Sequence, residues 1–318
     1  MIDLSRIEVF IHAAENLNFS QTAREMHVTQ PSVSHHIKML EKEIGKPLFF
    51  RGNGGLRLTE AGRLLLPWAR KLLHESFELK EMMNSLQQTI AGELRIACST
   101  TSGKYILPYL AARFHALHPD VHICILNCNA ENVVDDILQE RADLGVVSYD
   151  ACGGKLDCQE FFQDSIILIV PPDHPFATKK SIDPEELLDT PFIVRTAESG
   201  TRNVMLAELG KRDISLADMN ISLELGNAEA IVKTVEAGFG VSFVSRLAAE
   251  WALKCGLVVQ VDVQNFDLKR KIFMVRKHFQ VPNRVVESFW GFIHDDINKD
   301  LLLLPLINTR TVKKSKAE

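Results

Sequence analysis

The sequence predicts a multidomain chain of mixed class, α+β at its N-terminal end and α/β over the remainder. Up to Ile90 the apolar residues recur with helical spacing, interrupted by one pair of short strand-like runs. From Gly92 onward, apolar strand-like runs alternate with helical stretches, an order typical of sheets covered by helices. The length of 318 residues, 46% of them apolar, is sufficient for more than one packed core.

Composition and charge narrow the function classes. The chain has no run of roughly 18 apolar residues, so we expect it not to span a membrane. No basic segment followed by an apolar stretch occurs at the N-terminus, which predicts a cytoplasmic location and no membrane partner. The six cysteines form no C-x-x-C pair and are expected to be reduced thiols. A net charge of −5 argues against a globally basic nucleic-acid coat.

Three short helices are predicted at the N-terminal end. The first carries an apolar stripe with helical spacing that starts at Ile7. Ser20 is expected to cap the second helix and Thr29 the third, in which Pro31 occupies the first turn. Gly45 is expected to end the third helix. Because the turn between the second and third helices is short, the two helices must cross at a steep angle.

A β-hairpin is predicted after these helices. The apolar runs Leu48–Phe50 and Leu56–Leu58 flank the glycine-rich turn Gly52–Gly55. A hairpin in this position is the wing of a winged helix-turn-helix. We therefore assign residues 1–59 to a winged helix-turn-helix DNA-binding domain.

A long linker helix is predicted over residues 60–90. Leucines recur there every seven residues, which is typical of a seam between paired helices, although Pro67 and Glu75 interrupt the pattern. The residues expected to form the dimerisation seam are Leu65, Trp68, Leu72, Leu79, Met82 and Leu86. Since such a stripe needs a partner, we expect a homodimer or a homotetramer.

The α/β part, residues 91–300, is expected to form two lobes, because about 200 residues exceed one small α/β unit. The expected boundaries are residues 92–162 and 268–300 for lobe I, residues 163–267 for lobe II, and residues 301–318 for a tail without fixed structure. The chain would then cross twice between the lobes, at residues 161–165 and 262–268. These two crossings predict a hinge over a cleft.

Four blocks in order carry a family resemblance: residues 18–23 (NFSQTA), 28–34 (VTQPSVS), 40–49 (LEKEIGKPLF) and 58–62 (LTEAG). The chain resembles the LysR-type transcriptional regulators over nearly its whole length. The resemblance implies operator DNA and RNA polymerase as partners, a dimerising linker helix, and a two-lobed effector domain similar to periplasmic solute-binding proteins. Residues 194–202 and 225–231 resemble members that sense metabolic anions in sulfur and carbon fixation.

The third helix carries the residues expected to read DNA. Its apolar stripe turns inward, so polar residues near its N-terminal end face outward, as a recognition helix requires. Gln30 is suited to adenine, whereas Ser34 and Lys38 are suited to phosphate. His35 stands where many family members have Arg, which predicts pH-dependent affinity. The expected DNA-binding set is Gln30, Pro31, Ser32, Ser34, His35, Lys38 and Arg51. The alternative is that these residues only cover a solvated helix face.

Two hydroxyl-rich turns are expected to hold a small anionic metabolite across the cleft. Residues 99–103 follow the first strand of lobe I, and residues 199–202 precede a helix of lobe II. Free N–H groups at helix starts favour an anion, and Arg202 would clamp a carboxylate or phosphate. The expected effector set is Ser99, Thr100, Thr101, Asn129, Ser148, Ser199, Thr201, Arg202 and Asn227. The alternative is ordinary helix caps, with Arg202 in a surface ion pair.

Two further readings remain as alternatives. Cys152 and Cys158 would make a redox-responsive regulator of the same fold if they closed a disulfide, but neither has basic neighbours that favour a thiolate. A cytoplasmic solute-binding protein, or an enzyme on the two-lobed fold, would need an export signal or a catalytic constellation, and the sequence shows neither. We therefore expect no enzymatic activity, no cofactor and no metal.

Overall fold

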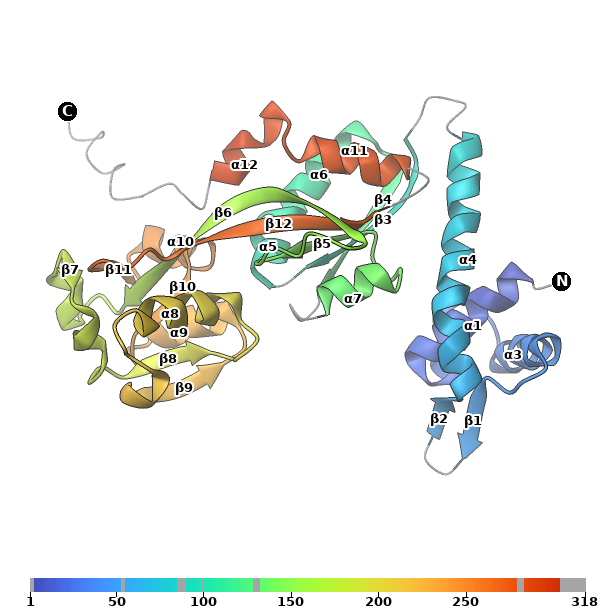
Figure 1. The fold of residues 1–318 in the computed structure, drawn as a ribbon, viewed down its shortest axis with the longest axis horizontal. Helices are drawn as coiled ribbons and strands as arrows, with labels where there is room; N and C mark the ends of the chain where they lie inside the picture. The colour runs from blue at the N-terminus through green and yellow to red at the C-terminus, as the bar shows by residue number, and fades with distance from the viewer. Residues whose placement is uncertain are drawn as a thin grey trace. The chain divides into compact units, whose positions relative to one another are not determined.

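The structure, a computed structural model, describes residues 3–52, 55–84, 90–98, 100–127, 132–278 and 283–303 (Figure 1). The chain divides into two compact units. One comprises Met1–Ala91 with Leu138–Arg141, and the other Gly92–Ile137 with Ala142–Glu318. Among the described residues, no helix is long and apolar enough to cross a bilayer.

The first unit begins with three helices, α1 (Leu4–Asn16), α2 (Phe19–Glu25) and α3 (Gln30–Ile44). The expectation that Ser20 caps the second helix is wrong. Asn18 caps it instead, because its side-chain oxygen accepts hydrogen bonds from the N–H groups of Ser20 and Gln21, at 2.9 and 3.2 Å. Thr29 caps α3, and Gly45 ends it in the left-handed conformation, φ 76°, as expected.

The wing consists of β1 (Phe49–Gly52) paired antiparallel with β2 (Gly55–Leu58), and the linker helix α4 (Glu60–Asn84) follows. Thr59 fixes this junction, since its hydroxyl donates to the carbonyl of Pro47 at 2.7 Å and accepts from the N–H of Gly62 at 3.0 Å. The core under these elements contains Ile7, Phe10, Phe19, Val33, Ile37, Leu40, Leu48, Phe49 and Ala69. Helices, wing and linker start thus share one core.

The second unit is built on a sheet of strand order β4-β3-β5-β12-β6-β11-β7, with β10 also paired to β6. Its strands are β3 (Gly92–Cys98), β4 (Val121–Asn127), β5 (Leu144–Val147), β6 (Leu156–Val170), β7 (Ser181–Ile182), β10 (Ser242–Ser245), β11 (Val259–Val263) and β12 (Lys269–Lys277). The long strand β6 belongs to both lobes. It pairs with β12 up to Ser165, and with β10 and β11 from Ile166. This change of partner marks a hinge between the lobes.

Helices cover the sheets of both lobes (Figure 1). Lobe I contains α5 (Thr100–Tyr105), α6 (Leu107–Leu117), α7 (Val133–Leu138), α11 (Arg284–Phe292) and α12 (Lys299–Leu303). Lobe II contains the parallel pair β8 (Phe192–Arg195) and β9 (Ile221–Leu225), with α8 (Gly200–Gly210), α9 (Ala228–Glu236) and α10 (Arg246–Cys255). The remaining 3-10 turns are Pro175–Thr178, Pro184–Leu187, Leu216–Asp218 and Asp296–Asn298. Helix α12 includes the first residues of the expected tail, and residues 304–318 lie outside the described residues.

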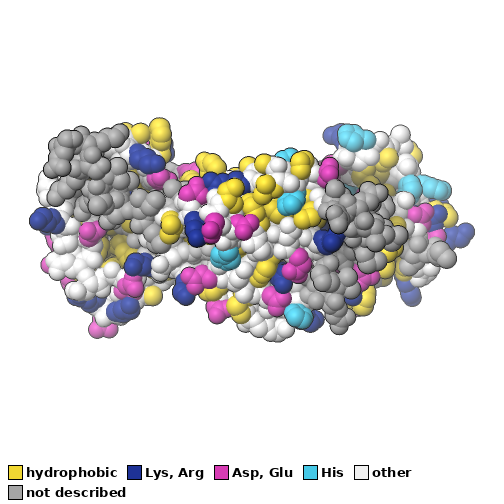
Figure 2. Space-filling model, turned by 90° about the horizontal axis from the view of Figure 1, so that it is seen from above, with side chains coloured by type: hydrophobic (Ala, Val, Ile, Leu, Met, Phe, Trp, Pro, Cys, Tyr) yellow, Lys and Arg dark blue, Asp and Glu magenta, His cyan; other side chains and the backbone are white. Residues whose placement is uncertain are grey.

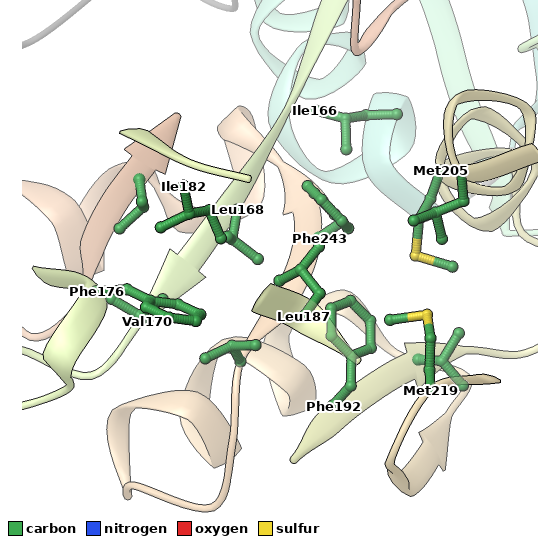
Figure 3. Packing of buried hydrophobic residues seen from close by; sticks show 14 of the residues in the cluster. Ile166, Leu168, Val170, Phe176, Ile182, Leu187, Phe192, Met205, Met219 and Phe243 are labelled. Carbon is green, nitrogen blue, oxygen red and sulfur yellow. The ribbon is translucent and has the colours of Figure 1, made fainter. Parts of the chain in front are cut away.

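Each lobe has its own apolar core. In lobe II, Leu168 of β6, Phe192 of β8 and Phe243 of β10 pack with Met205 and Met219 (Figure 3). In lobe I, the rings of Phe114 on α6 and Phe289 on α11 meet edge to face, with their centroids 5.1 Å apart. Two separately packed lobes joined by continuous strands can move as bodies about the hinge.

Candidate DNA-binding and effector-binding sites

Helix α3 presents the expected DNA-reading residues on one surface of the first unit. Val33, Ile37 and Leu40 are fully buried, so the residues between them face away from the core. The outward set includes the exposed Gln30, Pro31, His35 and Lys38 and the half-buried Ser32 and Ser34. The burial pattern therefore leaves this set outside the core, on the face that a groove-reading helix would use.

The wing carries a basic residue that sequence reasoning missed. Arg57 of β2 is exposed and stands opposite Phe50 of β1. The expected contact Arg51 lies in β1, but its side chain falls outside what the structure describes. The alternation of leucine and arginine in Leu56-Arg57-Leu58 was the available sequence signal for Arg57.

The described surface visible in Figure 2 shows no broad patch of charges of one sign. On the face shown in Figure 2, Lys and Arg side chains are interspersed with Asp and Glu, in agreement with the net charge of −5. Attraction of DNA must therefore come from particular residues of the first unit rather than from the whole molecule.

Two faces of the linker helix α4 carry large apolar side chains, one packed against the core and one exposed. Leu65 packs against the core of the first unit, together with Leu66 and Leu73. The large apolar side chains exposed on α4 are Leu64, Trp68, Leu72 and Leu79, at 68%, 65%, 40% and 57%. Sequence reasoning missed Leu64 as a seam candidate and named Leu65. The side chain of Met82 and all of Leu86 lie outside the described residues.

In the second unit, residues from both lobes meet at the start of α8. A Cβ atom added to Gly200 would lie 2.4 Å from the hydroxyl oxygen of Ser148, which follows β5 of lobe I. The same Cβ would lie 3.0 Å from Nη1 of Arg270 on β12. Glycine at this position thus permits a close approach of the lobes.

The first turn of α8 combines buried hydroxyl residues with backbone N–H groups. Ser199 is 8% exposed and Thr201 only 2%. Within the part of the chain that the structure describes, the Ser199 side chain makes no capping hydrogen bond to α8. The helix start therefore keeps N–H groups for another acceptor, which favours the anion-site interpretation over the ordinary-cap interpretation.

Two arginines that sequence reasoning did not select lie at this site. The Arg195 side chain donates to the carbonyl of Gly226 at 3.0 Å, while its buried Nε finds no hydrogen-bond partner among the described residues. Burial lowers the pKa of Arg195, and the positive charge of Arg270 lowers this pKa further. The two like charges would both be stabilised by an anion between them.

Arg270 is held by a buried carboxylate. Its side chain, 9% exposed, forms an ion pair of 2.6 Å with the fully buried Asp164 of β6. The Ser245 hydroxyl donates to the other oxygen of Asp164 at 2.8 Å. The guanidinium is therefore fixed where the strands pass from one lobe to the other.

The other expected effector residues take different roles. Arg202 donates to the carbonyl of Arg195 at 2.8 Å and pairs with Glu224 at 3.1 Å. Its guanidinium therefore holds the backbone of Arg195. Asn227 caps α9 by accepting from the N–H groups of Glu229 and Ala230. Thr101 is buried in α5. Ser99, Asn129 and the side chain of Thr100 lie outside the described residues.

A second contact joins the lobes beside this site. Glu229 of α9 accepts from Lys104 at 2.8 Å and from the Tyr105 hydroxyl at 3.0 Å, both on α5 of lobe I. These bonds lower the pKa of Glu229, with Lys104 the larger cause. Burial, and then Glu229, raises the pKa of Tyr105. The two residues of α5 and Glu229 form an interlobe latch.

Comparison with known proteins identifies both units. Residues 4–63 match the bacterial regulatory helix-turn-helix protein of the lysR family, and residues 87–298 match the LysR substrate binding domain. The chain belongs to the LysR family. It is a LysR-type transcriptional regulator with an effector-binding domain, and the expected family, fold class and general function are confirmed.

Two similar sequences cover nearly the whole chain. An HTH-type transcriptional regulator of Methanocaldococcus jannaschii is 32% identical over 91% of this chain and 98% of its own. The RuBisCO operon transcriptional regulator of Allochromatium vinosum is 30% identical over 92% of this chain and 95% of its own. The expected resemblance to regulators connected with carbon fixation is thereby confirmed.

Solved structures share the fold. Full-length OxyR from Pseudomonas aeruginosa superposes with a TM-score of 0.68, at 21% identity, over 92% of this chain and 95% of its own. Full-length CbnR complexed with its target DNA superposes with a TM-score of 0.67, at 19% identity, over 92% of this chain and 99% of its own. The CcmR regulatory domain of Synechocystis PCC6803 in complex with 2-PG superposes with a TM-score of 0.59, at 26% identity, over 66% of this chain and 98% of its own.

Proposed function

We propose that this regulator binds a small dianionic metabolite between its two lobes and that the metabolite changes operator binding or DNA bending. The ligand would lie against the first turn of α8, between Arg195 and Arg270, with Ser148 on the side of lobe I. The observation that carries this proposal is the buried Nε of Arg195, which has no hydrogen-bond partner among the described residues and lies near the charge of Arg270. A phosphate or dicarboxylate would accept hydrogen bonds from both guanidinium groups.

The CcmR regulatory domain supports the ligand class. Its structure contains 2-phosphoglycolate, a small phosphorylated acid. The present chain spans 98% of that domain at 26% identity. A phosphorylated carboxylic acid of this size is therefore the probe that we select first.

The test is a thermal-shift titration of the full-length protein with 2-phosphoglycolate, with acetate as the monoanion comparison. A ligand at one hundred times its dissociation constant stabilises the folded state by about 2.7 kcal/mol. Arg195→Met should lower this affinity by about 1.5–3 kcal/mol, because a charged hydrogen-bond donor is lost. Arg212→Met is the matched control, since Arg212 is an exposed arginine of lobe II that lies 3.8 Å from Glu185. Equal shifts in both variants would refute the assigned site.

On the DNA side, the proposed reading residues are those of the outward face of α3, with Arg51 and Arg57 in the wing. The exposed stripe Leu64, Trp68, Leu72 and Leu79 of α4 is the proposed dimerisation surface. Two copies would place two recognition helices on successive half-sites and so compensate for the weak basicity of one arm. We propose that the chain acts in the cytoplasm, with RNA polymerase as a further partner and without catalysing a reaction.

A further inference from the structure

Three side chains of types that can bind metals meet where the segment after β5 enters β6. Asp150, Cys152 and Cys158 offer one carboxylate oxygen and two sulfur atoms, which all lie within 4.8 Å of one another. The backbone N–H of Cys152 donates to the Asp150 carboxylate at 2.9 Å, and the two thiols share a hydrogen bond. None of the three side chains belongs to the effector site described above.

The local fold explains why these groups converge. Gly153 and Gly154 have φ values of 120° and 63°, a conformation that side chains disfavour, and they reverse the chain between the two cysteines. Gly153 then pairs with Leu156 across the turn. Cys158 lies on β6, where it is in register with Val275 of β12. One thiol is thus on a paired strand and the other on the facing turn.

Charged groups of both signs surround the cluster. Asp150 belongs to it, and Asp157 directly precedes Cys158. Arg276 of β12 and His278, which directly follows this strand, both face Asp157, at 3.5 and 3.1 Å. A cation bound between the two sulfurs would stabilise both thiolates.

We propose that Asp150, Cys152 and Cys158 bind a thiophilic divalent cation of the zinc class. Two sulfurs and one carboxylate oxygen match the ligands of Zn²⁺. With Zn–S bonds of about 2.3 Å, tetrahedral sulfurs lie about 3.8 Å apart, so the ligands need to close by at most about 1 Å. Binding releases two thiol protons to the solvent. Three protein ligands leave a fourth position for water, which makes the site exchangeable rather than structural.

The position of the site in the chain connects it with the cleft. Asp150 stands two residues after Ser148, whose hydroxyl lies against the start of α8. Cys158 lies on the same strand as Asp164, the residue that holds Arg270. Closure of the ligands on a cation would therefore pull on both segments that lead to the cleft. The site itself stands independently of the proposed effector.

The experiment uses the full-length protein, kept reduced by a phosphine that does not bind metals. Cd²⁺ is added while the sulfur-to-cadmium charge-transfer absorbance is followed, and Zn²⁺ is then added in competition. We expect a band that saturates at one equivalent per chain and that Zn²⁺ abolishes. Cys152→Ser and Cys158→Ser should each weaken binding, roughly 10–100-fold, and Asp150→Asn should weaken it less.

Cys255→Ser is the matched control, because Cys255 is an exposed cysteine at the end of α10 and outside the cluster. It should bind Cd²⁺ like the wild type. Circular dichroism of each variant without metal checks that the fold is retained, and Asp150→Asn tests the site without changing a cysteine. A band of unchanged affinity in the Cys152→Ser/Cys158→Ser double variant would overturn the proposal. Absence of any band in the reduced wild type would overturn it equally.

Discussion

Arg270 donates two hydrogen bonds to a single carboxylate oxygen of Asp164, from Nε at 2.9 Å and from Nη2 at 2.6 Å. The pair joins β12 to β6 at the last residues that these strands share before β6 changes partner. Because Nε and Nη2 are occupied, Nη1 is the atom that faces the start of α8. The ion pair therefore couples the hinge to the site proposed for the anion.

The first prediction concerns this buried pair. Asp164→Ala leaves the Arg270 charge without its partner, and we expect the effector domain to lose about 3–5 kcal/mol of stability. The control is Glu160→Ala on the same strand, because Glu160 pairs with Lys271 of β12 at 2.8 Å but both side chains are exposed. That change should alter stability by at most about 1 kcal/mol. Urea unfolding of both variants measures the difference, and similar midpoints would contradict it.

The second prediction concerns the approach of the lobes at Gly200. Gly200→Ala would put a methyl group against the Ser148 hydroxyl and Arg270 Nη1, so these side chains or the lobes that carry them must shift. We expect weaker binding of 2-phosphoglycolate with little loss of stability. Gly210→Ala in the same helix is the control, since no atom lies within 4 Å of its added Cβ. Calorimetric titration measures the affinity of each variant for 2-phosphoglycolate. Equal affinities would mean that binding does not depend on the close approach of the lobes at Gly200.

Local signals in the sequence explain why the first unit was predictable. Thr29 and Gly45 bound α3 through a cap and a left-handed glycine, both of which depend on adjacent residues alone. The same kind of signal placed the start of α2 two residues too late, at Ser20. Asn18 is the cap, because its side chain accepts from the N–H groups of the first turn. The seven-residue repeat located α4 but not its free face. The repeat predicts Leu65 and not Leu64 for the dimerisation seam. It cannot show that Leu65 packs against the core of the first unit, because this contact depends on the tertiary structure.

The effector site was only partly predictable for the same reason. The start of α8 is visible from its serine, glycine and threonine, and the structure puts Ser199, Thr201 and Ser148 near one place. Arg195 on β8 and Arg270 on β12 are distant in sequence and lie in different sheets, so only tertiary packing brings their charges near each other. The position of Arg202 in the first turn of α8 predicts it as the clamp. In the structure its guanidinium is occupied by Glu224 and the Arg195 carbonyl.

The third prediction tests the dimerisation surface. Leu72→Glu combined with Leu79→Glu places charges in the exposed stripe of α4, and we expect a monomer, because charged residues in a coil seam lose their hydration. Arg63→Glu is the control, since Arg63 is exposed on the same helix and donates to the Leu58 carbonyl, away from the stripe. Sedimentation velocity reports the assembly state. A double variant that sediments like the wild type would exclude this stripe from the interface.

The fourth prediction separates base reading from phosphate contact on α3. Gln30→Ala should relax operator sequence preference and weaken binding by about 1–3 kcal/mol, because a bidentate base contact is lost. Lys38→Ala should weaken binding to all sequences alike and reduce the salt slope by about one ion. Footprinting on operator and scrambled DNA at several salt concentrations provides both quantities. Unchanged preference in the Gln30 variant would remove Gln30 from base reading.

The last prediction concerns the interlobe latch of Lys104, Tyr105 and Glu229. Because these hydrogen bonds lower the pKa of Glu229, the latch is complete above the usual glutamate pKa and is lost as the pH falls through the lowered value. Glu229→Gln removes the charge at every pH, so amide exchange in α5 and α9 should become faster than in the wild type at neutral pH. Glu236→Gln on the same helix is the control, since Glu236 pairs with Lys233 within α9. As the pH is lowered, the wild type should approach the exchange rates of Glu229→Gln, after allowance for intrinsic exchange. Equal rates in the wild type and Glu229→Gln at neutral pH would show that the latch does not hold the lobes together.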